Sequence, residues 1–371
     1  MKRLLLLAVV LAFGAGQVAG AQAPTPFKLG TFQRNATAFV GVVLRDSVVI
    51  DLAAANRAIP GKTLAPPPGD MKDVIARYDT GVRDRINEIV RAVVAASGPR
   101  PAYVQELASL KTLPPIMPAT LLNAAVNYRA HGEEMARRDG GTSPGLGGSG
   151  RGAALPAGTA SPATQSAPGI WERRAGDTRW NPYLFLKATS AIIAEGEAIR
   201  IPVGRTQIDW ECELGVVIGR TASRVPAAAA AGYIFGYTIE HDVSDRQGRG
   251  DDRYGSSDWL IGKSHDTFAP LGPFITPKEF IADPQKLPVR FTLNGKLMQD
   301  ASTSFMIHTV FELLSYGSHI LTLRPGDVVA TGTPDGVGSA RTPPIFLKAG
   351  DRTACTYEGV GTLSNPVENA R

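Results

Sequence analysis

The stretch from Gln207 to Gly219 most strongly constrains the fold, because it places three carboxylates in an otherwise apolar run. Read as a β-strand, its two-residue period puts Asp209, Glu211 and Glu213 on one face. Carboxylates gathered on one face repel one another and resist burial unless a cation neutralises them. Two interpretations follow: a buried site for a hard divalent ion with oxygen ligands, or the solvent-exposed acidic face of an edge strand.

A second acidic segment lies downstream, in the run from Gly236 to Asp245. Its apolar first half predicts a strand that ends in Glu240, His241 and Asp242. Functional groups are often presented where regular elements end. We therefore expect Asp242 to complete the cation site.

The segment Asn127–Met135 begins a helix-like turn in which His131 and Glu134 are three residues apart. Side chains at this spacing are neighbours on a helix. A carboxylate held against an imidazole fixes its tautomer and raises its basicity, which produces a general base. The same spacing is common in surface pairs, and no second histidine follows that would make a zinc motif.

Apolar patterning predicts the other elements. Phe39–Leu44 and Ser47–Ile50 indicate a hairpin, and helical spacing extends over Met71–Ala96 with an interruption at Gly81. Many strands with few helices and no regular βαβ alternation favour a mostly β fold with some α, as a closed or rolled sheet. Further along, one helix is predicted at Ser304–Ser318 and strands at Tyr183–Phe185, Ile208–Ile218, Ile234–Ile239, Val289–Leu293, Val328–Thr331 and Ala354–Tyr357.

The first 21 residues have the layout of a secretory signal peptide. Lys2 and Arg3 precede the apolar run Leu4–Phe13, and small residues up to Ala21 provide a cleavage site. We expect cleavage near Ala21 and an exported protein, periplasmic if the source is Gram-negative; an uncleaved N-terminal anchor is the alternative. No later stretch approaches the roughly 20 apolar residues of a membrane span.

The charge pattern argues against a nucleic-acid partner. The formal net charge of +5 falls to +3 without Lys2 and Arg3. The other bases are interspersed with acids, as in Arg83-Asp84-Arg85, and form no run or stripe. A nucleic-acid groove needs clustered phosphate contacts.

The chain has two cysteines, Cys212 and Cys355. Cys212 lies between two of the acidic residues but points to the opposite strand face. We interpret it as a small buried apolar residue, with a disulfide to Cys355 as the alternative.

Five blocks of the sequence resemble the fumarylacetoacetate hydrolase family. They occur in the order found in that family and cover about residues 116–369. The β-rich segment Phe27–Leu52 also resembles the small N-terminal domain that many members carry. The blocks are Asn127–Met135, Asp209–Gly219, Gly236–Arg246, Gly262–Pro273 and Pro325–Pro334.

The resemblance implies a mixed β-roll catalytic domain preceded by a small β-rich N-terminal domain, usually in a homodimer. It also implies a Mg²⁺ or Mn²⁺ ion, or Ca²⁺, held by Glu211, Glu213 and Asp242. The corresponding division of this chain is a signal peptide over 1–21, the small domain and linker over 22–115, and the catalytic domain over 116–371. Lys111–Pro118, with three prolines, is the expected linker.

The resemblance further implies the roles of individual residues. His131 and Glu134 would position and deprotonate a water molecule, and Lys263 would add positive charge near a developing oxyanion. Thr333 would meet a substrate carboxylate. The other residues expected to bind substrate are Gly332, Tyr128, Arg246 and His265.

The activity implied by the resemblance is cleavage of a C–C bond in 2,4-dioxo acids by a metal-dependent hydrolase, through an enolate that the metal ion stabilises. One alternative is an isomerase or decarboxylase that acts on a 2-oxo or 2-hydroxy dienedioate in aromatic catabolism. A second alternative is a non-catalytic exported protein that binds small acids.

The sequence departs from the family pattern at two places. His241 and Asp245 stand where the family more often has asparagine and alanine, so we expect a different pocket rim. Residues 139–178 are longer than the usual connection and rich in Gly, Ala and Pro. Such a segment buries too little apolar surface to offset its ordering entropy. We expect it to be a lid insertion beside the site.

Overall fold

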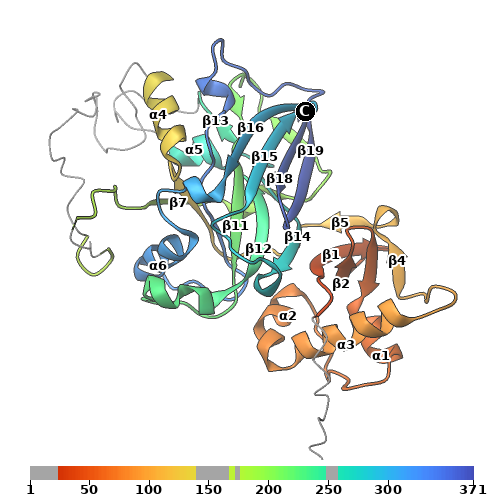
Figure 1. Cartoon of the computed structure of the whole chain (residues 1–371). Coiled ribbons are helices and arrows are strands. Elements are labelled where there is room, and N and C mark those ends of the chain that lie inside the picture. Colours follow the sequence, from red (N-terminus) through yellow and green to blue (C-terminus); the bar gives the residue numbers. More distant parts are fainter. Residues whose placement is uncertain (1–23, 139–166, 172–175, 248–257) are drawn as a thin grey trace, which may run out of the picture.

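The computed structural model describes residues 24–138, 167–171, 176–247 and 258–371. Figure 1 shows the N-terminal elements, coloured mostly red to orange, beside one end of the larger yellow-to-blue part. The N-terminal strands are β1 (Lys28–Arg34), β2 (Thr37–Leu44), β3 (Val48–Asp51), β4 (Val104–Glu106) and β5 (Lys111–Leu113), and the helices are α1 (Leu52–Ala58), α2 (Met71–Arg77) and α3 (Val82–Ala95).

The predicted N-terminal hairpin is confirmed, because β2 and β3 pair in antiparallel fashion. Its turn spans residues 45–47, in which Arg45 and Asp46 have φ angles of 52° and 51°, the left-handed backbone common in tight hairpin turns. The predicted helical segment is also confirmed, as α2 and α3. A 3-10 turn over Tyr78–Thr80 and then Gly81, with φ of 125°, separate them.

The prediction of an irregular linker over Lys111–Pro118 is partly wrong. Lys111–Leu113 forms β5, which pairs with β1, so the backbone groups at the start of this segment are satisfied by the sheet. A domain boundary near residue 115 stays a prediction.

The larger part of the molecule contains most of the strands, which confirms the expected mostly β fold with some α. Its strands are β6 (Leu121–Ala125), β7 (Tyr183–Lys187), β8 (Ile192–Ile193), β9 (Ile199–Ile201), β10 (Ile208–Asp209), β11 (Cys212–Ile218), β12 (Ile234–His241), β13 (Ser244–Asp245), β14 (Ala269–Pro277), β15 (Pro288–Leu293), β16 (Lys296–Ser302), β17 (Val328–Ala330), β18 (Arg352–Tyr357) and β19 (Gly361–Asn369). Its α-helices are α4 (Arg129–Arg138), α5 (Trp259–Lys263) and α6 (Val310–Ile320).

The main sheet curves back on itself. Its strand order is β4-β3-β2-β1-β14-β12-β11-β17-β6-β7, and β8 pairs with β14. From β14 the sheet runs through β12, β11, β17 and β6 to β7. β8 follows β7 closely along the chain and pairs with β14, so the last strand lies near the first and the sheet forms a roll. A second sheet, in the order β16-β15-β18-β19-β9, packs against it.

The expected strand over Gln207–Gly219 is interrupted. β10 ends at Asp209 and pairs with β13, whereas β11 begins at Cys212 and lies between β12 and β17. All seven residues of β11 are buried. The interpretation of this stretch as an exposed edge strand is therefore wrong.

Cys212 and Cys355 form a disulfide that joins β11 to β18, with their Cα atoms 5.5 Å apart. Both cysteines are buried, but the interpretation of Cys212 as merely a small apolar residue is wrong. The disulfide fixes the strand of the acidic motif to the second sheet.

The C-terminal helix α6 begins six residues later than expected. Thr309 is its N-cap, and Thr309 and Glu312 form a capping box that satisfies the first backbone N–H groups. The preceding residues are held differently, because Ile307 N donates to the carbonyl of Asn127 at 2.7 Å. Within the described ranges, no helix is long and apolar enough to cross a membrane.

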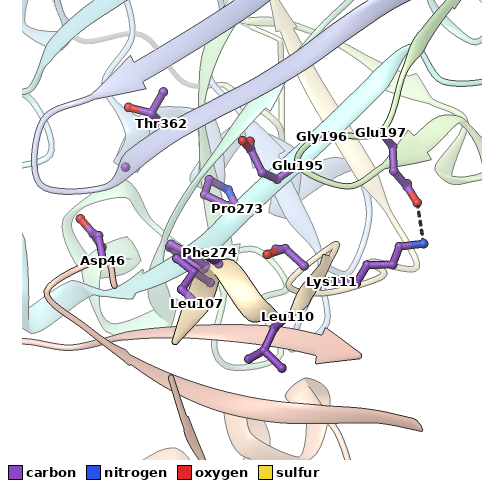
Figure 2. Close-up of a pocket in the computed structure, with 13 residues that line it drawn as sticks. Asp46, Leu107, Leu110, Lys111, Glu195, Gly196, Glu197, Pro273, Phe274 and Thr362 are labelled. Atoms are coloured by element: carbon purple, nitrogen blue, oxygen red, sulfur yellow. Dashed lines mark ion pairs between the residues drawn. The ribbon is translucent and has the colours of Figure 1, made fainter. Parts of the chain in front are cut away.

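A cavity of about 620 Å³ lies where the N-terminal elements meet the larger part (Figure 2). Two of the residues that line it, Lys111 and Glu197, form an ion pair at 3.2 Å. Its principal lining residues are Asp46, Leu107, Leu110, Lys111, Glu195, Glu197 and Phe274. None of the residues expected to bind metal or substrate lines this cavity.

Candidate active site

Three buried carboxylates meet where β11 and β12 lie side by side. Glu211 directly precedes β11, Glu213 is within it, and Asp242 directly follows β12. One carboxylate oxygen from each residue lies within 4.8 Å of the others. The antiparallel pairing continues past the end of β12, because Asp242 N donates to Glu211 O at 2.9 Å. The structure therefore brings together the three residues that the sequence suggested as metal ligands.

Cationic side chains neutralise two of these carboxylates. Lys263 Nζ lies 2.7 Å from Glu211 Oε2 and 2.5 Å from Asp242 Oδ2. Arg246 Nη2 lies 2.5 Å from Glu211 Oε1. Lys187 Nζ donates to Asp242 Oδ1. Sequence reasoning missed Lys187, because a single lysine at the end of a strand carries no recognisable pattern.

Glu213 has a different environment, since its Oε2 accepts a hydrogen bond from Gly332 N at 2.8 Å. Burial raises the pKa of Glu213 well above its usual value, and the carboxylates of Asp242 and Glu240 raise it further. Burial also opposes ionisation of Glu211, but the charges of Lys263 and Arg246 lower its pKa below the usual value. The cations that contact the cluster are thus bound to Glu211 and Asp242, and the raised pKa of Glu213 shows that its negative charge is disfavoured without a further cation. Its carboxylate oxygens fit a hard divalent cation.

Glu240 adds a fourth buried carboxyl group beside the cluster. It pairs directly with Glu213 in the β11–β12 register, and its Oε2 accepts a hydrogen bond from Asn123 Nδ2 at 3.2 Å. Burial, and then the charge of Asp242, raise the pKa of Glu240 well above its usual value. Sequence reasoning gave Glu240 no role; strand register was the signal that could have revealed it.

Asp209, the first acid of the motif, faces a loop instead of the cluster. Its Oδ1 accepts a hydrogen bond from Gly338 N at 2.7 Å, and its Oδ2 accepts one from Ser339 N at 3.1 Å. The same Oδ2 lies 2.9 Å from Arg246 Nε. Asp209 therefore orients Arg246, which also contacts Glu211.

The expected dyad is formed on α4. His131 Nδ1 lies 2.8 Å from Glu134 Oε1, and His131 is buried. This contact leaves Nε2 as the ring nitrogen that can accept a proton. The charge of His131 also lowers the pKa of Glu211, so the dyad lies within electrostatic reach of the carboxylates.

The residues expected to bind substrate have mixed positions. Gly332 N and Arg246 contact the acidic cluster directly. Thr333 Oγ1 accepts a hydrogen bond from Gln299 Nε2 at 2.9 Å. Tyr128 is buried, and its pKa is raised by burial and by the charge of Glu213.

His265 is held by one of the residues that departs from the family pattern. His265 Nε2 lies 3.2 Å from Asp245 Oδ2, and Arg205 Nε lies 3.3 Å from the same oxygen. An alanine at position 245 could hold neither side chain. The departure at Asp245 therefore corresponds to a local polar cluster.

The expected lid insertion, residues 139–178, lies mostly outside the described residues. Immediately after it, Arg179 Nη2 lies 2.8 Å from Glu312 Oε1, and Arg179 Nη1 donates to Ile307 O at 2.9 Å. Arg179 thus anchors the end of this segment to the start of α6.

Comparisons with known proteins cover most of the chain. A family model described as fumarylacetoacetate (FAA) hydrolase C-terminal matches residues 120–368. A mitochondrial oxaloacetate tautomerase of Xenopus laevis is 42% identical over 186 residues, which are 50% of this chain and 58% of that protein. The fumarylacetoacetate hydrolase domain-containing protein 2 homolog of Dictyostelium discoideum is 32% identical over 338 residues, which are 89% of this chain and 92% of that protein.

One solved structure with the same fold holds a bound metal ion. It is the maleylpyruvate hydrolase of Sphingobium sp. SYK-6 in complex with manganese(II) and pyruvate. This chain superimposes on it with a TM-score of 0.64 and 25% identity, over 93% of this chain and 100% of that one. In contrast, the match to the frog tautomerase spans less than two thirds of that protein's length.

The comparisons correct one expectation and confirm another. Related tautomerases of frog, rat and cattle are named as mitochondrial proteins, so the prediction of periplasmic export is wrong. The signal peptide expected over residues 1–21 lies outside the described residues. The resemblance that rested on five sequence blocks is confirmed by the extent of the family match. This chain belongs to the fumarylacetoacetate hydrolase family.

Proposed function

We propose that this chain is a divalent-metal-dependent enzyme that converts 2-oxo or 2,4-dioxo acids through an enolate. The observation that carries the proposal is the buried cluster of Glu211, Glu213 and Asp242 with Lys263 beside it. Mg²⁺ or Mn²⁺ bound there would act as a Lewis acid toward the oxygens of a 2-oxo acid. The related hydrolase crystallised with manganese(II) and pyruvate supports this choice of ion and substrate class.

Lys263 would supply a second positive charge at the same place. Burial opposes its protonation, but Asp242 and Glu211 raise its pKa above the usual value, so it stays an ammonium at neutral pH. A fixed cation beside a developing oxyanion stabilises the transition state without reorganising. Arg246, held by Asp209 and Glu211, adds a further positive charge to this side of the cluster.

Hydrolytic C–C cleavage is the reaction favoured by the His131–Glu134 dyad. His131 Nε2 would take a proton from water, while Glu134 holds Nδ1 and stabilises the imidazolium. The hydroxide equivalent adds to the 4-carbonyl carbon of the dioxo acid. The bond between C3 and C4 then breaks, and its electron pair becomes the enolate of the 2-oxo acid. Return to C3 of the proton that His131 took from water completes the products, a carboxylic acid and a 2-oxo acid.

Proton transfer without cleavage is the second candidate. The names of the tautomerases that match half of this chain favour it. Tautomerisation, isomerisation or decarboxylation would need the same charge stabilisation of an enolate, but no attack by water. In this reading His131 would move a proton to or from carbon.

A homodimer is part of the proposal, as the family resemblance implies.

The experiment is a turnover assay on acylpyruvates of increasing length and on oxaloacetate, with Mg²⁺ or Mn²⁺. The variants His131→Asn and Glu211→Gln are compared with the wild type. We expect Glu211→Gln to abolish every reaction. His131→Asn should lower the rate of hydrolysis at least 100-fold. Full hydrolytic activity in this variant would refute the assignment of the dyad. Binding without turnover of any substrate would instead indicate a non-catalytic protein that binds small acids.

A further inference from the structure

Lys187 is a buried lysine for which the proposed reaction has no use. It is the last residue of β7, and its side chain is 0% exposed. Its Nζ donates to Asp242 Oδ1 and, at 3.0 Å, to the main-chain carbonyl of Val243. A buried ammonium is costly unless it is both paired and hydrogen-bonded. Lys187 meets both conditions, because Asp242 pairs with it and the carbonyl of Val243 accepts its hydrogen bond.

The turn that Lys187 contacts is a break between two strands. β12 ends at His241 and β13 begins at Ser244, so Asp242 and Val243 lie between the two strands, with Asp242 N still donating to Glu211 O. An aspartate side chain has several staggered rotamers, so its contacts decide which one it adopts. Because Lys187 binds Oδ1, the other oxygen of Asp242 faces the acidic cluster, where Lys263 Nζ lies 2.5 Å away.

The contact depends on the closure of the roll. β7 is four strands away from β12 in the order of the sheet. Neighbouring strands are about 4.8 Å apart, so a flat sheet would separate β7 from β12 by roughly 19 Å. A lysine side chain cannot span that distance. The curvature that pairs β8 with β14 therefore also brings Lys187 to Asp242.

We infer that Lys187 is a positioning residue of the metal site, which holds Asp242 in the orientation where Oδ2 serves as a ligand. The inference rests on the proposed metal-dependent function. Lys263 makes a useful contrast, because its Nζ contacts the oxygens that a metal ion would use, Glu211 Oε2 and Asp242 Oδ2. Removing Lys187 should weaken metal binding, whereas removing Lys263 should not.

The test is titration calorimetry of Mn²⁺ with the wild type, Lys187→Met and Lys263→Met at one pH and ionic strength. Each variant loses one positive charge near the cluster, so a general electrostatic effect is the same in both. We expect the Kd of Lys187→Met to rise about 10- to 100-fold, as for other residues that orient metal ligands. The Kd of Lys263→Met should stay the same or fall. An unchanged or lower Kd in Lys187→Met would overturn the inference.

Two controls keep the result interpretable. Thermal unfolding without metal measures the structural contribution of Lys187 separately. Should Lys187→Met not fold, the Asp242→Asn single variant is compared with the Asp242→Asn/Lys187→Met double variant. Equal Mn²⁺ Kd values in these two variants support the inference that Lys187 acts through Asp242. A higher Kd in the double variant contradicts it. If the wild type itself binds no Mn²⁺, the proposed function fails, which distinguishes that failure from failure of the inference.

Discussion

Glu134 accepts a hydrogen bond from Gly336 N on its Oε2, at 2.9 Å, while its Oε1 faces His131. Gly336 lies in the loop of residues 332–338. Two other backbone N–H groups of this loop donate hydrogen bonds, Gly332 N to Glu213 and Gly338 N to Asp209. Three carboxyl groups with different tasks are thus held by the backbone of one loop. We expect the position of this loop to control the dyad and the metal site together.

Gly336→Ala tests the control exerted by the loop. Gly336 has a φ of 97°, and an added Cβ would lie 2.3 Å from Met298 O, so the loop must shift. We expect kcat to fall about 10- to 100-fold, since small misplacements of catalytic groups have effects of this size. The measurement is steady-state kinetics on the substrate identified in the turnover assay.

Gly350→Ala is the matched control for this variant. Gly350 has a similar φ of 94°, but an added Cβ would meet nothing within 4 Å. It should show the same backbone strain without the loss of kcat. Equal kinetic effects in the two variants would argue against a specific role of the loop.

Glu213→Gln should separate metal binding from stability. Without a metal ion, Glu213 is a buried carboxyl group. Its burial and the charges of Asp242 and Glu240 all oppose its ionisation. Glutamine removes this repulsion and can still accept a hydrogen bond from Gly332 N. We expect the metal-free Tm at pH 7 to stay equal or rise, while the Mn²⁺ affinity falls at least 100-fold.

Calorimetry and thermal unfolding of the same preparations provide both measurements for Glu213→Gln. The control is Glu368→Gln on β19, an exposed position, which should change neither quantity. A clear loss of metal-free stability in Glu213→Gln would show that this carboxylate has a structural cationic partner.

Local patterns predicted many of the elements and the candidate carboxylates of the strand motif, but not the contacts between distant segments. The hairpin and the helices on either side of Gly81 follow from neighbouring residues alone, and the spacing of Glu211 and Glu213 reflects strand period. Asp209 departs from that pattern because β10 ends there and pairs elsewhere. Lys187 acts only once the sheet has rolled, and no local signal encodes that closure.

Removal of the Cys212–Cys355 disulfide should destabilise the fold strongly. The bond joins residues 143 positions apart, and cross-links that close long loops restrict the unfolded chain most. For the Cys212→Ala/Cys355→Ala double variant we expect the free energy of unfolding to fall by about 2–5 kcal/mol. Urea unfolding with and without dithiothreitol checks this. The variant should not respond to the reductant, and equal urea midpoints for variant and oxidised wild type would contradict the prediction.

Glu195 should make stability fall as pH rises. Burial raises its pKa to about 7, although the hydrogen bond from Ser364 N opposes this shift. The unfolded chain ionises near 4.5. The favourable contribution of the neutral carboxyl group is therefore complete below pH 4.5 and is lost as pH rises through about 7. The loss is up to about 3 kcal/mol, because each pKa unit corresponds to 1.36 kcal/mol.

Glu195→Gln should remove this pH dependence, because glutamine stays neutral and can still accept from Ser364 N. We expect the variant to match the wild type at pH 4 and to exceed it at pH 8 by up to about 3 kcal/mol in urea unfolding. Glu197→Gln is the control from the same cavity (Figure 2). Glu197 pairs with Lys111, so its replacement removes an ion pair and should give no gain at pH 8. A stability difference between Glu195→Gln and the wild type that is the same at both pH values would show that ionisation of Glu195 does not cause it.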